Sequence, residues 1–261
     1  VWLRMALTTL VLAPFAITGF ARGPRPSRPQ VGLMLLAGIL LGGHFLLWTA
    51  SLGLTSVAAS VLLVSVHPLL VAPAGRWMLG ERVPLRAATG IALALAGTLV
   101  TCVGDLRISS TAIAGDGLAL AGAACLAGYL LIGRGVRSIG VIPYSAAVYA
   151  VVAVTAVLTA AAQGGLHAPS GRTLLACLAL AVVCTIGGHT VYNWALKHVR
   201  ALVVSTSFLG EPPLAAILAV ALLGNVPPPA TVIGGVLILA GLAISLRSLQ
   251  SDPRAPEPAL E

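Results

Sequence analysis

The sequence contains little charge. Only 8% of its 261 residues are charged, 58% are hydrophobic, and a single lysine, Lys197, stands among the 15 basic residues. Because a soluble domain carries about 25% charged residues, this composition excludes a soluble globular protein. The net charge of +8 does not indicate nucleic-acid binding, because the basic residues lie between apolar runs, where such residues set membrane topology.

The sequence also lacks the residue patterns of metal sites and common enzymes. Its four cysteines fall within or at the ends of apolar runs, without the spacing of metal ligands: Cys102, Cys125, Cys177 and Cys184. No GxSxG, HExxH or P-loop pattern occurs, which argues against a hydrolase, a zinc peptidase and an ATP-driven pump. We therefore expect packing cysteines, no metal, no cofactor and no catalytic residue, so the protein is not predicted to be an enzyme.

A series of apolar runs dominates what remains. About 20 residues of α-helix cross the roughly 30 Å hydrocarbon core of a bilayer. Nine runs approach that length, with predicted limits 2–20, 31–53, 57–79, 85–103, 116–134, 142–162, 173–196, 201–223 and 230–246. Since irregular backbone cannot satisfy its polar groups in lipid, the predicted fold class is an all-α, polytopic transmembrane helical bundle.

One stretch of the chain occurs twice. Gly42-Gly43-His44 recurs 145 residues later as Gly187-Gly188-His189. Further matches at this offset, or at 144 after one deletion, pair Trp48 with Asn193, Ser60 with Ser205, Pro68 with Pro213, Gly80 with Gly224, Gly90 with Gly234, and Gly97 with Gly241. Five predicted crossings separate the two copies, an odd number, so the copies point in opposite directions. Inverted repeats of this kind are typical of transporters.

The loop charges predict the orientation. Twelve basic residues fall on one side of the membrane: Arg22, Arg25, Arg28, Arg76, Arg82, Arg86, Arg134, Arg137, Lys197, Arg200, Arg247 and Arg254. The other side has only Arg107 and Arg172, beside Asp105 and Asp116. The positive-inside rule therefore places the C-terminus in the cytoplasm. Arginine in place of lysine, with abundant alanine and glycine, indicates a bacterial chain, and hence a multi-pass protein of the inner membrane.

The repeat also predicts the domain organisation. Residues 1–103 form the first repeat, 104–115 a periplasmic linker, 116–246 the second repeat, and 247–261 a disordered cytoplasmic tail. The first repeat has four spans and the second has five. The missing mate of helix 116–134 should precede Val1, so we expect ten spans in the intact protein.

Glu211 is the ionisable residue that most needs an explanation. It lies near the middle of its span and is followed by Pro212-Pro213. A charge at the bilayer centre costs about 2.5–3.5 kcal/mol on insertion scales, and the prolines should kink or open the helix there. We predict that Glu211 couples transport to a proton or cation, or binds a substrate amine. The alternative is a structural carboxylate.

Other polar side chains in the spans define a candidate substrate site. His67 is also central in its span and precedes Pro68, so we predict a coupling and binding role for it. His44 with Trp48, and His189 with Tyr192 and Asn193, form polar-aromatic faces of helical spacing, as a substrate pocket needs. The alternative for these residues is hydrogen bonding between helices. The glycine pairs beside His44 and His189 are expected to allow close helix approach.

Arg4 lies close to one end of the first span. It could pair with a substrate carboxylate or with Glu211. Its place near the end of the span favours a third interpretation, in which the side chain extends to the outer interface.

With these features the chain resembles the EamA-type members of the drug/metabolite transporter superfamily. The resemblance covers residues 1 to about 246 and is carried by Arg4, Leu79-Gly80-Glu81, Gly90, Gly97, Glu211-Pro212, Leu223-Gly224, Gly234 and Gly241. It implies two five-helix halves of inverted topology that export amino acids and other small metabolites. Two departures are Asn225, where the family commonly has glutamate, and the missing first helix.

Residues and resemblance together favour a secondary transporter that exports small metabolites, such as amino acids or related amphipathic compounds, by alternating access. Expected partners are a small-molecule substrate and membrane lipid, with a coupling proton and a homodimer as open hypotheses. Two alternatives are an intramembrane enzyme acting on a lipid-linked substrate, with His67 and Glu211 as acid and base, and a non-transporting membrane scaffold subunit.

Overall fold

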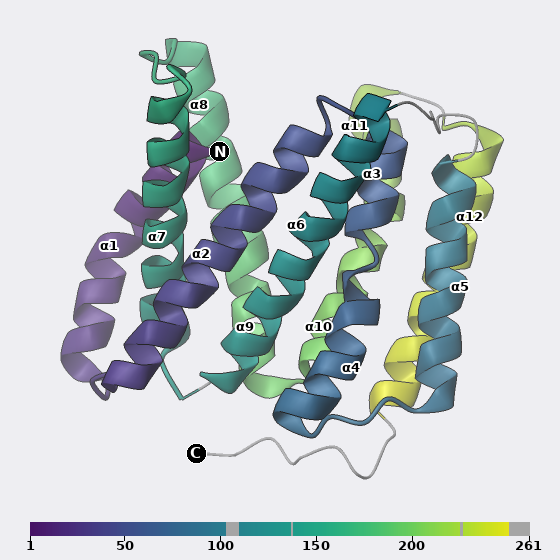
Figure 1. Ribbon diagram of the computed structural model, residues 1–261, viewed down its shortest axis with the longest axis horizontal. Helices are drawn as coiled ribbons and strands as arrows, with labels where there is room; N and C mark the ends of the chain where they lie inside the picture. The colour runs from purple at the N-terminus through teal and green to yellow at the C-terminus, as the bar shows by residue number, and fades with distance from the viewer. Residues whose placement is uncertain (103–109, 137, 225–226, 251–261) are drawn as a thin grey trace. The chain divides into compact units, whose positions relative to one another are not determined.

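The computed structural model describes residues 1–102, 110–136, 138–224 and 227–250. Within these ranges the chain is helical and has no strand, and nine regions are long and apolar enough to cross a membrane (Figure 1). The predicted all-α, multi-pass membrane fold is therefore confirmed. Asp105, Arg107, Arg137, Asn225 and Arg254 lie outside the described residues.

The helices follow the predicted spans closely. In chain order they are α1 (Trp2–Arg22), α2 (Arg28–Ser51), α3 (Val57–Val64), α4 (His67–Leu79), α5 (Leu85–Cys102), α6 (Ser110–Gly135), α7 (Val141–Ala162), α8 (Gly171–Ala179), the π-helix η1 (Leu180–His189), α9 (Thr190–His198), α10 (Ala201–Ser207), the 3₁₀ turn η2 (Phe208–Gly210), α11 (Glu211–Leu223) and α12 (Pro229–Gln250). Residues 110–115 and 247–250, expected in the linker and the tail, are helical. Arg247 in the last turn of α12 favours this extension, because a cation stabilises a helix C-terminus.

The chain divides into two compact units, and these units are not the two repeats. The first unit consists of Val1–Leu46 and Gly128–Val199, and the second of Leu47–Ala127 and Arg200–Glu261. Each unit therefore combines helices from both halves of the sequence, and α2 and α6 contribute residues to both units.

In the first unit, α1 packs along its repeat mate α7, and the two lie side by side in Figure 1. Small residues set the helix separations. A Cβ added at Gly19 would lie 2.7 Å from Pro143 Cγ, and one at Gly42 would lie 2.6 Å from Thr155 Oγ1. The expected close approach is thus found at Gly42. It is wrong for Gly187 and Gly188, where an added Cβ would meet nothing closer than 3.5 Å.

In the second unit, α5 and α12 pack tightly through glycines (Figure 1). A Cβ at Gly90 would lie 2.6 Å from the carbonyl oxygen of Gly241, and one at Gly97 would lie 2.7 Å from that of Gly234. The repeat pairs Gly90 with Gly234 and Gly97 with Gly241. The contact is therefore self-complementary, as a two-fold axis between inverted repeats requires.

Two spans are broken at equivalent places in the two repeats. The span 57–79 divides at Ser65-Val66, and α4 restarts at His67-Pro68. The span 201–222 passes through η2 and restarts at Glu211-Pro212. Proline has no N–H to donate and its ring crowds the preceding turn, so a helix restarts there more readily than it continues. The interruption expected at Pro212-Pro213 is found as the 3₁₀ turn η2 directly before Glu211.

The repeats differ in one helix. The span Gly171–His198 contains the ten-residue π-helix η1, which ends at His189. Its repeat mate α2 is α-helical throughout. π-Helical segments widen the backbone and are frequent at functional sites. The π-helix η1 therefore favours a functional position for His189, its last residue.

Candidate functional site

Phe45 of α2 is the centre of an aromatic cluster in the first unit. Its ring centroid lies 5.2 Å from that of His44 and 5.4 Å from that of His189. The His189 ring meets Tyr192 of α9 edge-on at 6.3 Å. The structure therefore brings together three of the predicted site residues, and it does so through Phe45. The sequence pattern alone does not single out Phe45, and its one signal is its place directly after His44.

Arg4 of α1 belongs to the same cluster. Its guanidinium carbon lies over the Phe45 ring, 4.8 Å from the centroid, which is a cation–π arrangement. The Arg4 Nε atom is buried and has no hydrogen-bond partner among the described residues. The contact with Phe45 places the cation beside the aromatic cluster of the first unit, and the expectation that the side chain extends to the outer interface stays a prediction.

Asn193 of α9 occupies a separate hydrogen-bond network in the first unit. Its side-chain amide donates to Ser145 Oγ at 2.9 Å and to the Tyr149 hydroxyl at 3.3 Å. Its carbonyl oxygen accepts from the Tyr129 hydroxyl. The Asn193 side chain is 5% exposed, so its polar atoms join α6, α7 and α9. A direct contact with a solute stays a prediction.

His67 joins two broken helices in the second unit. Its Nδ1 lies 3.0 Å from the carbonyl oxygen of Val64, and its Nε2 lies 3.2 Å from that of Ser205 in α10. The Phe208 ring of η2 meets the imidazole edge-on at 5.6 Å. A neutral imidazole has one N–H and can donate to only one carbonyl, whereas the protonated ring donates to both. The protonation state therefore decides whether His67 donates to one of these two carbonyls or to both.

Glu211 is the first residue of α11 and is exposed on the second unit. Its carboxylate has neither a hydrogen-bond nor an ion-pair partner among the described residues of that unit. A position at a helix N-terminus favours the negative charge. The carboxylate thus stands exposed on its own unit at the break in the span. The remaining predicted site residue, Trp48, is half-buried in α2, and its carbonyl oxygen accepts from Ser51 Oγ at 2.7 Å.

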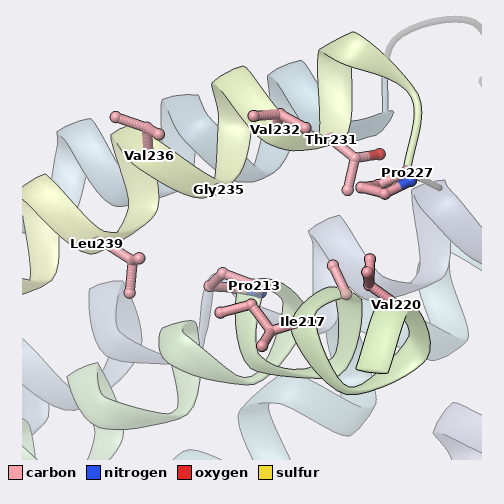
Figure 2. A pocket seen from close by; sticks show the side chains of 10 residues that line it. Pro213, Ile217, Val220, Pro227, Thr231, Val232, Gly235, Val236 and Leu239 are labelled. Carbon is pink, nitrogen blue, oxygen red and sulfur yellow. The ribbon is translucent and has the colours of Figure 1, made fainter. Parts of the chain in front are cut away.

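The second unit also contains an apolar cleft between α11 and α12. Its cavity is about 200 Å³ in volume, and Figure 2 shows Pro213, Ile217, Val236 and Leu239 on its walls. Residues two positions apart on an α-helix point to nearly opposite sides. Glu211 therefore lies on the face of α11 away from this cleft, and we do not assign the cleft to the candidate site.

Known proteins place this architecture in a family. The EamA-like transporter family model matches residues 1–103 and 113–247, whereas no protein with a curated description matches the sequence. One solved structure, described only as a crystal structure of a protein, is 23% identical with a TM-score of 0.78, and the match covers 95% of this chain and 88% of the other. At that identity the likeness shows the fold. With nine apolar spans of membrane-crossing length among the described residues and a family match along nearly the whole chain, the protein belongs to the EamA-like transporter family and is a multi-pass membrane transporter.

Proposed function

We propose that this transporter is a secondary exporter of small metabolites, such as amino acids or related amphipathic compounds, working by alternating access in a bacterial inner membrane. One observation carries the proposal. Two spans are broken at positions that the repeat aligns to within one residue, and each restarts on an ionisable residue followed by proline, His67 in one and Glu211 in the other. Broken spans of inverted repeats are where transporters bind substrates and coupling ions.

Glu211 and His67 are proposed to couple solute movement to protons. The Glu211 carboxylate stands at the break of its span without a partner in its own unit, so it can take up and release a proton as its surroundings change. His67 binds carbonyl oxygens of both α3 and α10, and loss of its proton removes one of these bonds. Protonation thereby changes how the two broken spans are held together.

The predicted binding residues are proposed to contact the solute. In the first unit they are His44, His189, Tyr192 and Asn193, and in the second unit they are Trp48, His67 and Glu211. Aromatic rings with a few polar groups suit amphipathic solutes.

Efflux from proteoliposomes tests this function. Purified protein is reconstituted, the vesicles are loaded with a mixed metabolite pool, a pH gradient is imposed, and the released compounds are identified by mass spectrometry. We expect selective loss of one compound class that stops when the gradient is collapsed. In Glu211→Gln the response to the gradient should vanish, whereas Glu211→Asp, which keeps a titratable carboxylate, should retain it.

Two results would count against the proposal. If correctly inserted protein releases no compound selectively, export is wrong. If Glu211→Gln transports as well as the wild type at every pH, the coupling role of Glu211 is wrong while export stands.

A further inference from the structure

Arg4 is a partly buried cation near one end of a membrane span. It lies in the first turn of α1, and its side chain is only partly exposed. A charge near the end of a span costs less than the roughly 2.5–3.5 kcal/mol that insertion scales assign at the helix centre, but its buried donors still need a compensating interaction. Arginines inside membrane spans therefore usually pair with an anion or with backbone carbonyls.

A second buried arginine in the same unit shows how the chain compensates such a charge. Arg134 of α6 is 5% exposed, and its Nη1 donates to the carbonyl oxygens of Leu196 at 3.1 Å and of Lys197 at 3.2 Å. These carbonyls lie in the last turn of α9, where the helix dipole is negative. Arg4 has no such carbonyl acceptor among the described residues, and its Nε is an orphan donor.

The first unit cannot supply an anion for Arg4 either. The sequence of residues 1–46 and 128–199 contains no aspartate and no glutamate. The cation–π contact with Phe45 covers one face of the guanidinium. Its N–H donors point outward in the plane of the group, so this contact orients the cation without using a hydrogen-bond donor.

The neighbours of Arg4 indicate what kind of anion fits. The Phe45 ring that holds the guanidinium is flanked by His44 and His189, so the donors stand beside a cluster of planar rings. A planar guanidinium binds a carboxylate through two parallel hydrogen bonds, and the rings favour an apolar or aromatic body next to it. We propose that Arg4, held by Phe45, is the receptor for a carboxylate group on the solute, with solutes that carry a carboxylate beside an aromatic or apolar body as the preferred class. This inference rests on the proposed transport function and specifies its substrate.

Binding can be measured without transport. The thermal unfolding of the purified protein in detergent is followed with benzoate, with benzamide and with acetate over a range of concentrations. Benzamide keeps the ring and the size of benzoate but has no charge, and acetate keeps the carboxylate without the ring. We expect benzoate to stabilise the wild type at lower concentrations than either of the other two.

Variants assign the effect to Arg4. Arg4→Gln should weaken benzoate binding by about tenfold or more, because it removes a charge-assisted pair of hydrogen bonds. Arg4→Lys, which keeps the charge but not the planar pair of donors, should weaken it less. Phe45→Leu should weaken it severalfold by freeing the guanidinium. The matched control is Arg22→Gln, which removes the same charge from the exposed end of the same helix and should leave benzoate binding unchanged.

The outcomes separate this inference from the proposed function. Equal stabilisation by benzoate and benzamide, or unchanged benzoate binding in Arg4→Gln, overturns the carboxylate receptor. Benzoate binding that emerges only in Glu211→Gln also overturns it, because Arg4 would then already be neutralised by that carboxylate. If Arg4→Gln does not unfold cooperatively, benzoate binding is compared between Arg4→Lys and Arg22→Gln. Weaker binding in Arg4→Lys alone supports the receptor, and equal binding in the two variants overturns it. If benzoate binds but no compound is released selectively, the carboxylate receptor is supported and the exporter function is wrong. If the protein exports only solutes that lack a carboxylate, the exporter function is supported and the carboxylate receptor is wrong.

Discussion

At the scale of single residues, a mutation of Asn193 can test whether its side chain stabilises the fold or is available to bind the solute. Its amide makes three side-chain hydrogen bonds, to Tyr129, Ser145 and Tyr149. Hydrogen bonds between membrane helices contribute about 0.6 kcal/mol on average. Asn193→Ala should therefore lower the free energy of unfolding by about 1–3 kcal/mol, since two tyrosine hydroxyls also lose a partner. Chemical unfolding in detergent measures this loss.

Gln163→Ala is the matched control for Asn193→Ala. It removes the exposed amide that follows α7 in the same unit, and it should change stability by no more than about 0.5 kcal/mol. If Asn193→Ala changes the free energy of unfolding as little as Gln163→Ala does, the hydrogen-bond network contributes nothing to the stability of the fold. The amide would then be free to serve the solute, as its place in the repeat predicted.

The sequence identified some of these residues and missed others for a physical reason. His44 and His189 stand out because polar rings are rare in apolar spans and because the repeat pairs them. Phe45, which joins them, is an ordinary apolar residue and carries no signal of its own. The position of Arg4 was ambiguous because the length of its side chain allows both an interface and an inward position. The contact of its guanidinium with the Phe45 ring is visible only in the structure.

At the scale of helices, the glycine contact of α5 with α12 gives a sharp prediction. A Cβ at position 241 would lie 2.5 Å from both the Gly90 carbonyl oxygen and the Ala94 nitrogen. These are backbone atoms of a packed helix and cannot turn aside. Gly241→Ala should therefore lower the free energy of unfolding by about 1–3 kcal/mol, the usual cost of overpacking. Unfolding in detergent again provides the measurement.

Gly117→Ala provides the comparison, because nothing lies within 4 Å of a Cβ at this exposed position of α6. Alanine has a higher helix propensity than glycine by about 1 kcal/mol, so this variant should be neutral or stabilised. A Gly241→Ala variant that is as stable as Gly117→Ala would mean that α5 and α12 are not in close contact.

The helix breaks show what sequence can and cannot predict for an element. The breaks before Pro68 and Pro212 both follow from the chemistry of proline, and the sequence analysis predicted the one at Pro212. The π-helix η1 was not expected, because no single residue type imposes it. The cause lies in the packing of the whole span, and local propensities of residues 180–189 do not reveal it.

At the scale of the whole chain, the inverted repeat is the feature that sequence predicts most fully. Matches at offsets of 145 and 144 paired Gly90 with Gly234 and Gly97 with Gly241. The structure turns this pairing into two reciprocal contacts, Gly90 with Gly241 and Gly97 with Gly234. Hydropathy and repeat together thus predict which helices are mates. They do not predict that the compact units each combine parts of both repeats, because that division depends on packing between distant segments.

The orientation of the chain in the membrane is the last prediction. Arg22, Arg25 and Arg28 crowd the loop between α1 and α2, whereas the loop before α8 has only Arg172 beside it. In a chain whose natural cysteines are replaced, a cysteine at the exposed position Ala168 should react with a membrane-impermeant maleimide in intact cells. A cysteine at Ser27, in the arginine-rich loop, should react only after permeabilisation. The opposite pattern would place the C-terminus outside. It would also mean that twelve basic residues had been carried across the membrane, against the bias that orients multi-pass proteins.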